Sequence, residues 1–168
     1  MLKLVKVTGG EDLSHVRELF LAYAEWIGID LSFQNFNNEL ENLPGDYAPP
    51  GGCLLLALYD DQPAGCVAVR KIDAEICEMK RLYVTPEFNG LGIGKRLATE
   101  IIAEAKRLGY AKMRLDTMPK MAPAQKLYRS LGFKEIEPYR YNPVEGTIFM
   151  ELDLTTENTK NTENVYRD

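Results

Sequence analysis

The sequence predicts one domain over residues 1–154, of α/β class in its mixed α+β form, with a mostly antiparallel sheet of about six to seven strands flanked by about four helices. Three observations support this fold. Short apolar or alternating segments recur with the length of strands, longer segments carry apolar residues at helical spacing, and glycines stand where those helices would end. The length of 168 residues also suits one hydrophobic core.

The first half of the chain predicts a strand, two helical segments and a meander. Residues 2–7 alternate apolar and basic side chains, as a half-buried strand does. The spacing of apolar residues from Asp12 predicts a helix that ends near Gly28, and a second helical segment covers about residues 33–43. After a loop rich in Pro and Gly, strands joined by short turns are expected at 53–59, 64–72 and 75–84.

The second half predicts two helices and three strands. Apolar residues repeat every four positions from Ile93 to Leu108, which predicts a helix, and another helix runs from about Met121 to Leu131. Residues 155–168 are polar and have no apolar period, so we expect a disordered tail. The remaining strands are expected at 112–116, 133–136 and 147–154.

Composition and charge argue against several functional classes. No apolar run approaches the roughly 20 residues that cross a bilayer, and the N-terminus lacks the apolar stretch of a signal peptide. We therefore expect a cytoplasmic protein with no membrane partner. The formal net charge of −5 argues against a nucleic-acid partner. The three cysteines lack CxxC spacing and His15 is the one histidine, so neither a metal site nor a Cys–His nucleophile is expected.

The segment 78–102 holds the most informative pattern, in which a strand and a turn are followed by glycines at 90, 92 and 94 and then a helix. Glycines at a helix start leave backbone amides unobstructed, and the positive end of the helix dipole favours a pyrophosphate there. A tight turn against the sheet is the alternative. Neither a Walker A loop nor a Rossmann GxGxxG fits, since the required Gly and Ser or Thr positions are occupied by Lys95 and Arg96.

Two motifs resemble the signatures of the GNAT superfamily of N-acetyltransferases. Residues 89–94, NGLGIG, are similar to its acetyl-CoA signature, (Q/R)xxGx(G/A), and residues 124–133 resemble its second signature, AxxLYxxxGF. Asn89 stands where the family usually has Gln or Arg, and Met121 where many relatives have Asn. The resemblance covers residues 75–136 and is only topological before them. It implies a GNAT fold and an acetyltransferase that uses acetyl-CoA as co-substrate.

The resemblance also implies which residues bind the cofactor. The pantetheine arm would lie beside the strand at Leu82, Tyr83 and Val84 and bond to its main chain. The pyrophosphate would lie on the amides of the glycine loop, where Lys95 either adds a cationic contact or points to solvent. Ala124 and Tyr128 of the second signature complete the set, in which the loop residues are Asn89, Gly90, Leu91, Gly92, Ile93, Gly94 and Lys95.

Two side chains are candidates for the proton steps. Tyr128 resembles the family's general acid, which protonates the departing CoA thiolate, although a tyrosine on the apolar side of a helix is more often part of the packing. Glu78 resembles a strand carboxylate that takes the proton of the attacking amine, which is protonated at neutral pH. Glu75, a water chain, or a purely salt-bridged role for Glu78 beside Lys80 and Arg81 remain alternatives.

The acceptor is expected to be a small primary amine, attacking directly in a ternary complex. Its site would come from the first helix, residues 28–50 and residues 138–146, where aromatic and acidic side chains suit a cation or simply cover the core. These side chains are Trp26, Phe33, Phe36, Tyr47, Tyr139 and Tyr141, with Asp30, Glu39, Glu41 and Asp46. The acceptor's identity, the acyl chain and the oligomeric state stay open, with a homodimer compatible. The rival function is an acyl-CoA sensor or a GNAT module that has lost catalysis.

Overall fold

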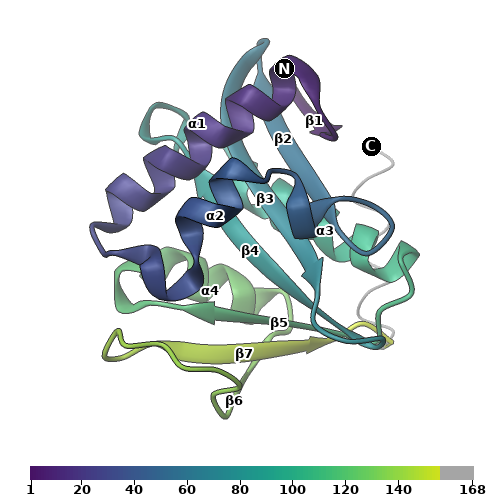
Figure 1. The fold of residues 1–168 in the computed structure, drawn as a ribbon, viewed down its shortest axis with the longest axis vertical. Helices are drawn as coiled ribbons and strands as arrows, with labels where there is room; N and C mark the ends of the chain where they lie inside the picture. Colours follow the sequence, from purple (N-terminus) through teal and green to yellow (C-terminus); the bar gives the residue numbers. More distant parts are fainter. Residues whose placement is uncertain (156–168) are drawn as a thin grey trace.

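The computed structural model describes residues 1–155 and contains one sheet of seven strands (Figure 1). The strand order is β1-β2-β3-β4-β5-β7-β6, and only the β4–β5 pair is parallel. The mostly antiparallel sheet and its meander of β2, β3 and β4 confirm the predicted fold class. The strands are β1 (Leu2–Lys6), β2 (Cys53–Tyr59), β3 (Gln62–Lys71), β4 (Ile76–Val84), β5 (Lys112–Thr117), β6 (Lys134–Ile136) and β7 (Ile148–Asp153).

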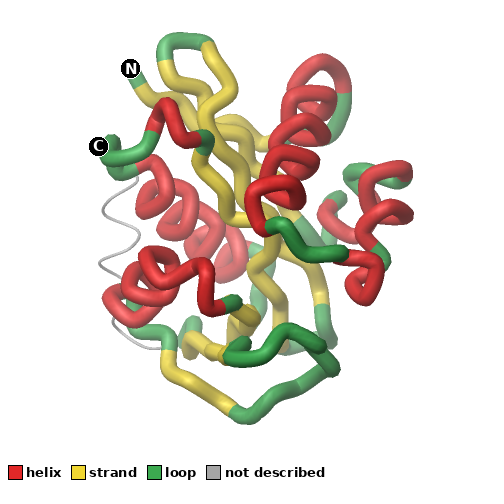
Figure 2. Tube along the Cα trace, turned by 90° about the vertical axis from the view of Figure 1, so that its left-hand side faces the viewer, coloured by secondary structure: helices red, strands yellow, loops and turns green. Residues whose placement is uncertain are grey.

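Helices cover both faces of this sheet (Figure 2). On one face, α1 and α2 pack against Leu54 and Leu56 of β2, while α3 and the end of α4 share the opposite core with Leu55 and Ala57. Because successive side chains of a strand point to opposite faces, the unbroken apolar run of β2 fills both cores. The helices are α1 (Gly10–Ile27), α2 (Phe36–Glu41), α3 (Ile93–Arg107) and α4 (Ala122–Ser130).

The second helical segment expected from the sequence is divided in two. A short 3-10 helix, Leu31–Gln34, is separated from α2 by Asn35, which has φ of 56° and therefore ends one helical turn before the next begins. The predicted tail, residues 155–168, lies outside the described residues except for Thr155. Among the helices of residues 1–155, none is long and apolar enough to cross a membrane.

The strands β4 and β5 diverge, and this divergence positions the site. They pair only from Ile76 with Lys112 to Glu78 with Arg114, whereas β5 goes on pairing with β7 as far as Thr117. Figure 1 shows the two strands close together at one end and apart at the other. Among residues 1–155, the edge of β4 that faces β5 therefore has no partner strand beyond Glu78, and its main-chain groups can bind an inserted ligand.

Candidate active site

A bulge interrupts β4 just after it leaves β5. Two residues, Arg81 and Leu82, face the single residue Val67 of β3. Arg81 has φ of 61°, in the left-handed region that residues other than glycine seldom adopt. Bulges turn a strand and redirect its side chains, so this one aims the end of β4 into the space between the two strands.

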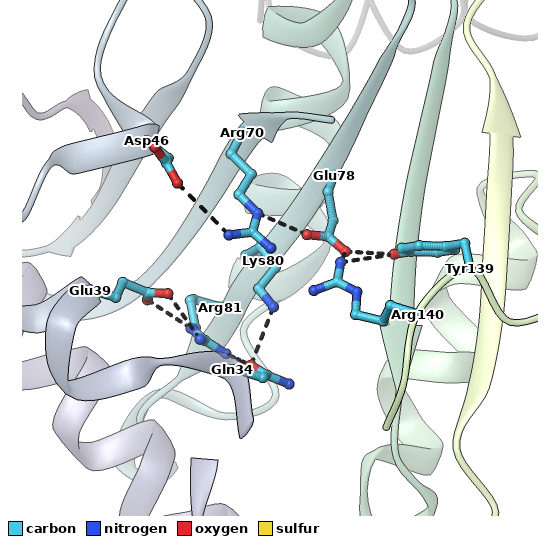
Figure 3. Close-up of polar contacts among 9 residues, drawn as sticks. All are labelled: Gln34, Glu39, Asp46, Arg70, Glu78, Lys80, Arg81, Tyr139 and Arg140. Carbon is cyan, nitrogen blue, oxygen red and sulfur yellow. Dashed lines mark hydrogen bonds and ion pairs between the residues drawn. The ribbon is translucent and has the colours of Figure 1, made fainter. Parts of the chain in front are cut away.

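The side chain of Arg81 holds the bulge in place. Its Nε and Nη2 donate to the Glu39 carboxylate at 2.9 and 3.0 Å, and its Nη1 donates to Gln34 Oε1 at 2.6 Å (Figure 3). The Arg81 side chain is almost wholly buried, and its guanidinium also lies over the ring of Phe36 at 5.1 Å. A paired guanidinium of this kind explains how a strained residue persists here.

A cleft of about 490 Å³ opens where the strands diverge. It is lined by all three of the predicted strand residues, by most of the glycine loop and by Ala124. The structure adds residues that the sequence reasoning had not placed on the cofactor, among them Trp26 and Lys120, which contact one another across the cleft. The full lining is Trp26, Leu82, Tyr83, Val84, Pro86, Phe88, Asn89, Gly90, Gly92, Ile93, Gly94, Lys120, Met121, Pro123, Ala124 and Leu127.

The glycine loop presents free amides to this cleft. Gly90 and Gly92 have φ of 82° and 76°, and a Cβ at either position would meet nothing within 4 Å, so the space in front of them is open. Gly92 caps α3 without a side-chain hydrogen bond, and the first intrahelical bond runs from Arg96 N to Gly92 O. The amides of residues 93–95 precede that bond and suit a pyrophosphate. Leu91 and Lys95 are exposed and do not line the cleft.

The cleft therefore fits a long ligand with an anionic end and an extended arm. The loop amides are suited to donate hydrogen bonds to phosphates, and the unpaired edge of β4 can bond to the amide groups of pantetheine. Residues 13–133 match the acetyltransferase (GNAT) family.

The chain belongs to the GNAT family of acetyltransferases. It is 44% identical to an uncharacterized N-acetyltransferase of Schizosaccharomyces pombe over 147 residues, which are 86% of this chain and 90% of that protein. A GNAT family acetyltransferase from Elizabethkingia anophelis with acetyl-CoA bound has a TM-score of 0.66 at 23% identity, covering 90% of this chain and 97% of the other. The predicted family and acyltransferase class are confirmed, and GNAT relatives bind acetyl-CoA.

A more distant likeness concerns half of the chain. Human N-acetylaspartate synthetase is 35% identical over 89 residues, which are 52% of this chain and 30% of that protein. This GNAT chain thus spans under a third of the synthetase's length.

Tyr128, which the sequence analysis predicted to contact the cofactor, does not line the cleft. Its side chain is buried and packs edge-on against Phe133, with ring centroids 5.6 Å apart. Burial raises the pKa of its phenol, and the nearby charge of Asp116 raises it further. The phenol therefore keeps its proton at neutral pH, as a general acid must. Tyr128 instead lines a second, small cavity of about 20 Å³, which shares Leu82 and Met121 with the cleft.

Glu78, the predicted general base, is surrounded by side chains that bind its carboxylate. It is fully buried, accepts from Arg70 Nε at 2.9 Å and from the Tyr139 hydroxyl at 2.6 Å, and pairs with Arg140 (Figure 3). Both carboxylate oxygens are thus occupied, and Glu78 lines neither the cleft nor the small cavity. Its role as base stays a prediction, and these contacts support the salt-bridged alternative.

Besides the bulge residue Arg81, the small cavity is lined by two charged residues that the sequence reasoning did not select, Lys80 and Asp116. Lys80 is 5% exposed, and burial, with the neighbouring Arg81 charge, lowers its pKa to about 7. Asp116 accepts from Asn142 Nδ2 at 3.3 Å. Each lies two residues after the last β4–β5 pair, Glu78 with Arg114. A prediction that these two strands pair in parallel would therefore have placed Lys80 and Asp116 opposite each other.

The acidic residues expected to bind the acceptor have other partners. Glu39 pairs with Arg81, Asp46 lies 4.0 Å from Arg70, and Asp30 accepts from Ser32 N at 2.9 Å. Tyr47 is buried in the core, whereas Tyr141 is exposed. These side chains form a wall of the site, and Glu39, Asp46 and Tyr47 line a separate cavity of about 160 Å³.

Proposed function

We propose that this GNAT protein transfers the acetyl group of acetyl-CoA to the primary amine of a small molecule, by direct attack in a ternary complex. The observation that carries the proposal is the meeting of two cavities where β4 and β5 diverge. The cleft and the small cavity share Leu82 and Met121. A thioester in the cleft and an amine in the small cavity would therefore approach each other at this point.

The net reaction sets what the protein must do with protons. An ammonium ion and a thioester give an amide, a thiol and one proton, as a C–N bond forms and the C–S bond breaks. In this proposal the Tyr128 phenol gives a proton to the thiolate sulfur. Two carboxylates are candidates for taking the amine's proton: Glu78, expected from the sequence, and Asp116, which lines the cavity beside Tyr128.

The cysteines support direct attack over an acyl-enzyme route. Burial raises the pKa of the Cys53 thiol to about 11 and that of Cys77 to about 12. Cys66 is fully buried, and burial raises the pKa of its thiol as well. A thiol of raised pKa is a poor nucleophile at neutral pH, and none of the three lines the cleft or the small cavity.

The relatives support an amine acceptor of small size. N-acetylaspartate, after which the synthetase is named, is an N-acetylated amine of a small molecule.

The test is product formation by the purified chain. We expect incubation with acetyl-CoA and a panel of amines to release free thiol and to give an acetylated amine by mass spectrometry. Tyr128→Phe keeps the ring against Phe133 but removes the proton, so kcat should fall about 10²–10⁴-fold with little change in the KM for acetyl-CoA. Tyr141→Phe, on an exposed side chain, should leave the rate unchanged.

The possible results separate the enzyme from its rival. A tight acetyl-CoA complex that yields no product from any amine would favour the acyl-CoA sensor. Full activity in Tyr128→Phe would discard the proposed acid and leave the transferase standing.

A further inference from the structure

Lys80 is a buried cation whose partner is neutral. Its Nζ donates to Gln34 Oε1 at 3.2 Å, and this oxygen already accepts from Arg81 at 2.6 Å. An ammonium group has three donors, and among the described residues Lys80 Nζ has this one hydrogen-bond partner. A buried charge without an anion is costly, so the site is electrostatically incomplete.

The carboxylates around Lys80 do not complete it. Glu39 is held by Arg81, and Glu78 by Arg70 and Arg140. Figure 3 shows Lys80 pointing toward Gln34. The ion pair of Arg81 with Glu39 lies on one side of it, and Glu78 with its arginines lies on the other. Among the described residues, no carboxylate forms an ion pair with Lys80, and Asp116 is the remaining carboxylate whose charge acts on it.

Asp116 stands opposite Lys80 across the gap between the strands. Glu78 and Arg114 are the last pair of the β4–β5 ladder, and Lys80 and Asp116 each follow two residues later. Side chains two residues apart share a face of the sheet, so the two charges flank the gap from equivalent positions. Both line the small cavity with Tyr128, and its 20 Å³ admits a small polar group.

A cation and an anion on opposite sides of a narrow gap match a ligand that carries both charges. We propose that the acceptor is an amino acid or another small aminocarboxylate, whose carboxylate pairs with Lys80 and whose amine lies against Asp116, beside the phenol of Tyr128. This assignment rests on the proposed acetyl transfer and names its substrate class. Asp116 takes one proton from the ammonium, and the free amine forms the C–N bond as the C–S bond breaks. The thiolate receives the Tyr128 proton, and the second proton that the nitrogen loses returns to the Tyr128 phenolate, so that one proton in all is released through Asp116.

The experiment compares acceptors that differ only in the carboxylate. The full chain, with saturating acetyl-CoA, is assayed by thiol release on L-leucine, L-leucinamide and isoamylamine, and on L-phenylalanine and phenethylamine, with dicarboxylic amino acids added to cover acidic side chains. We expect at least one amino acid to have a kcat/KM about 10- to 100-fold above its matched amine, the difference that one charge-assisted hydrogen bond makes.

Lys80→Met is the matched variant. It should lower the ratio of kcat/KM between the amino acid and its amine at least tenfold, mainly through the KM of the amino acid. Lys3→Met, on an exposed lysine of β1, should keep the ratio. A wild-type preference for the amines that lack a carboxylate would overturn the aminocarboxylate assignment while the acetyl transfer stands. A preference that survives Lys80→Met would overturn it too, and no acetylation of any amine would instead refute the proposed function.

Discussion

Glu78 and Lys80 lie two residues apart on one face of β4, yet their surroundings give them opposite properties. Glu78 has three donors on its two oxygens, two of them from arginines. Within the described part of the chain, Lys80 Nζ donates to one neutral acceptor. A carboxylate with this many donors has little capacity to accept a proton from substrate. A buried ammonium with few partners can bind the anionic group of a ligand. At this scale the number of hydrogen-bond and ion-pair partners distinguishes the two residues: Glu78 supports the structure around the site, and Lys80 is the one proposed to bind the ligand.

The two candidate bases, Asp116 and Glu78, should differ in how the activity of their variants depends on pH. Asp116→Asn should reduce kcat/KM most at neutral pH and recover as the pH rises toward about 10, because solvent then supplies the free amine. Glu78→Gln should lose activity evenly across pH and lose stability on the order of 3 kcal/mol, since Arg70 and Arg140 lose their shared anion. The measurement is a pH–rate profile of both variants with urea unfolding. Recovery at high pH in Glu78→Gln alone would restore Glu78 as the base.

Sequence reasoning selected Tyr128 and the glycine loop because each lies in a local motif, and their roles stay predictions. It missed Lys80 and Asp116 because their importance comes from facing one another across two strands, which no local spacing records. Glu78 illustrates the converse, since its position in the strand resembles a base while Tyr139 and Arg140, some 61 residues on, occupy its oxygens.

At the scale of elements, the start of α3 shows what local sequence patterns can predict. Apolar periodicity and a glycine stop were enough to predict the helix, which the structure has at Ile93–Arg107, and the loop glycines predict an anion site at its start. The bulge in β4 was not predictable in this way. Arg81 carries no turn signal of its own, and its left-handed backbone is stabilised by Glu39 and Gln34, which lie over 40 residues earlier.

Gly92→Asp tests the loop as an anion site. Asp tolerates the left-handed backbone at φ of 76°, but its carboxylate would lie in the open space where the phosphates approach. Acetyl-CoA at about 100 times its dissociation constant adds roughly 2.7 kcal/mol, or about 5–10 °C in the thermal midpoint of a domain of this size. We expect Gly92→Asp to abolish this shift.

Gly28→Asp is the control for this experiment, because Gly28 has nearly the same backbone, with φ of 68°, and also faces open space at the end of α1. It should keep the shift. An unchanged shift in Gly92→Asp, or an equal shift with NAD in the wild type, would refute the phosphate assignment.

At the scale of the whole molecule, the gap between β4 and β5 carries a cost in stability. The edge of β4 gives up main-chain partners, Arg81 holds a strained backbone, and Lys80 is buried beside other cations. Sites prepared for a ligand commonly carry such costs, which the rest of the core offsets. Here the two large apolar cores on either side of the sheet do so.

Lys80 makes this cost measurable through pH. Burial and the charges of Arg81 and Arg70 lower its pKa from 10.5 to about 7, against the opposing effect of Asp116 and Glu39. Below pH 7 the lysine is protonated in both states and the folded chain bears the full penalty. Between about 7 and 10.5 the unfolded chain binds the extra proton, so the stability of the wild type rises with pH.

Lys80→Met removes the cost of burying this charge. The gain in unfolding free energy of the variant over the wild type should therefore be largest below pH 7 and should shrink as the pH rises. Urea unfolding at pH 6 and near pH 9, with Lys3→Met as the control, measures this difference. A gain that is the same at both pH values would show that Lys80 is not a buried cation awaiting an anion, and the carboxylate would then need another partner.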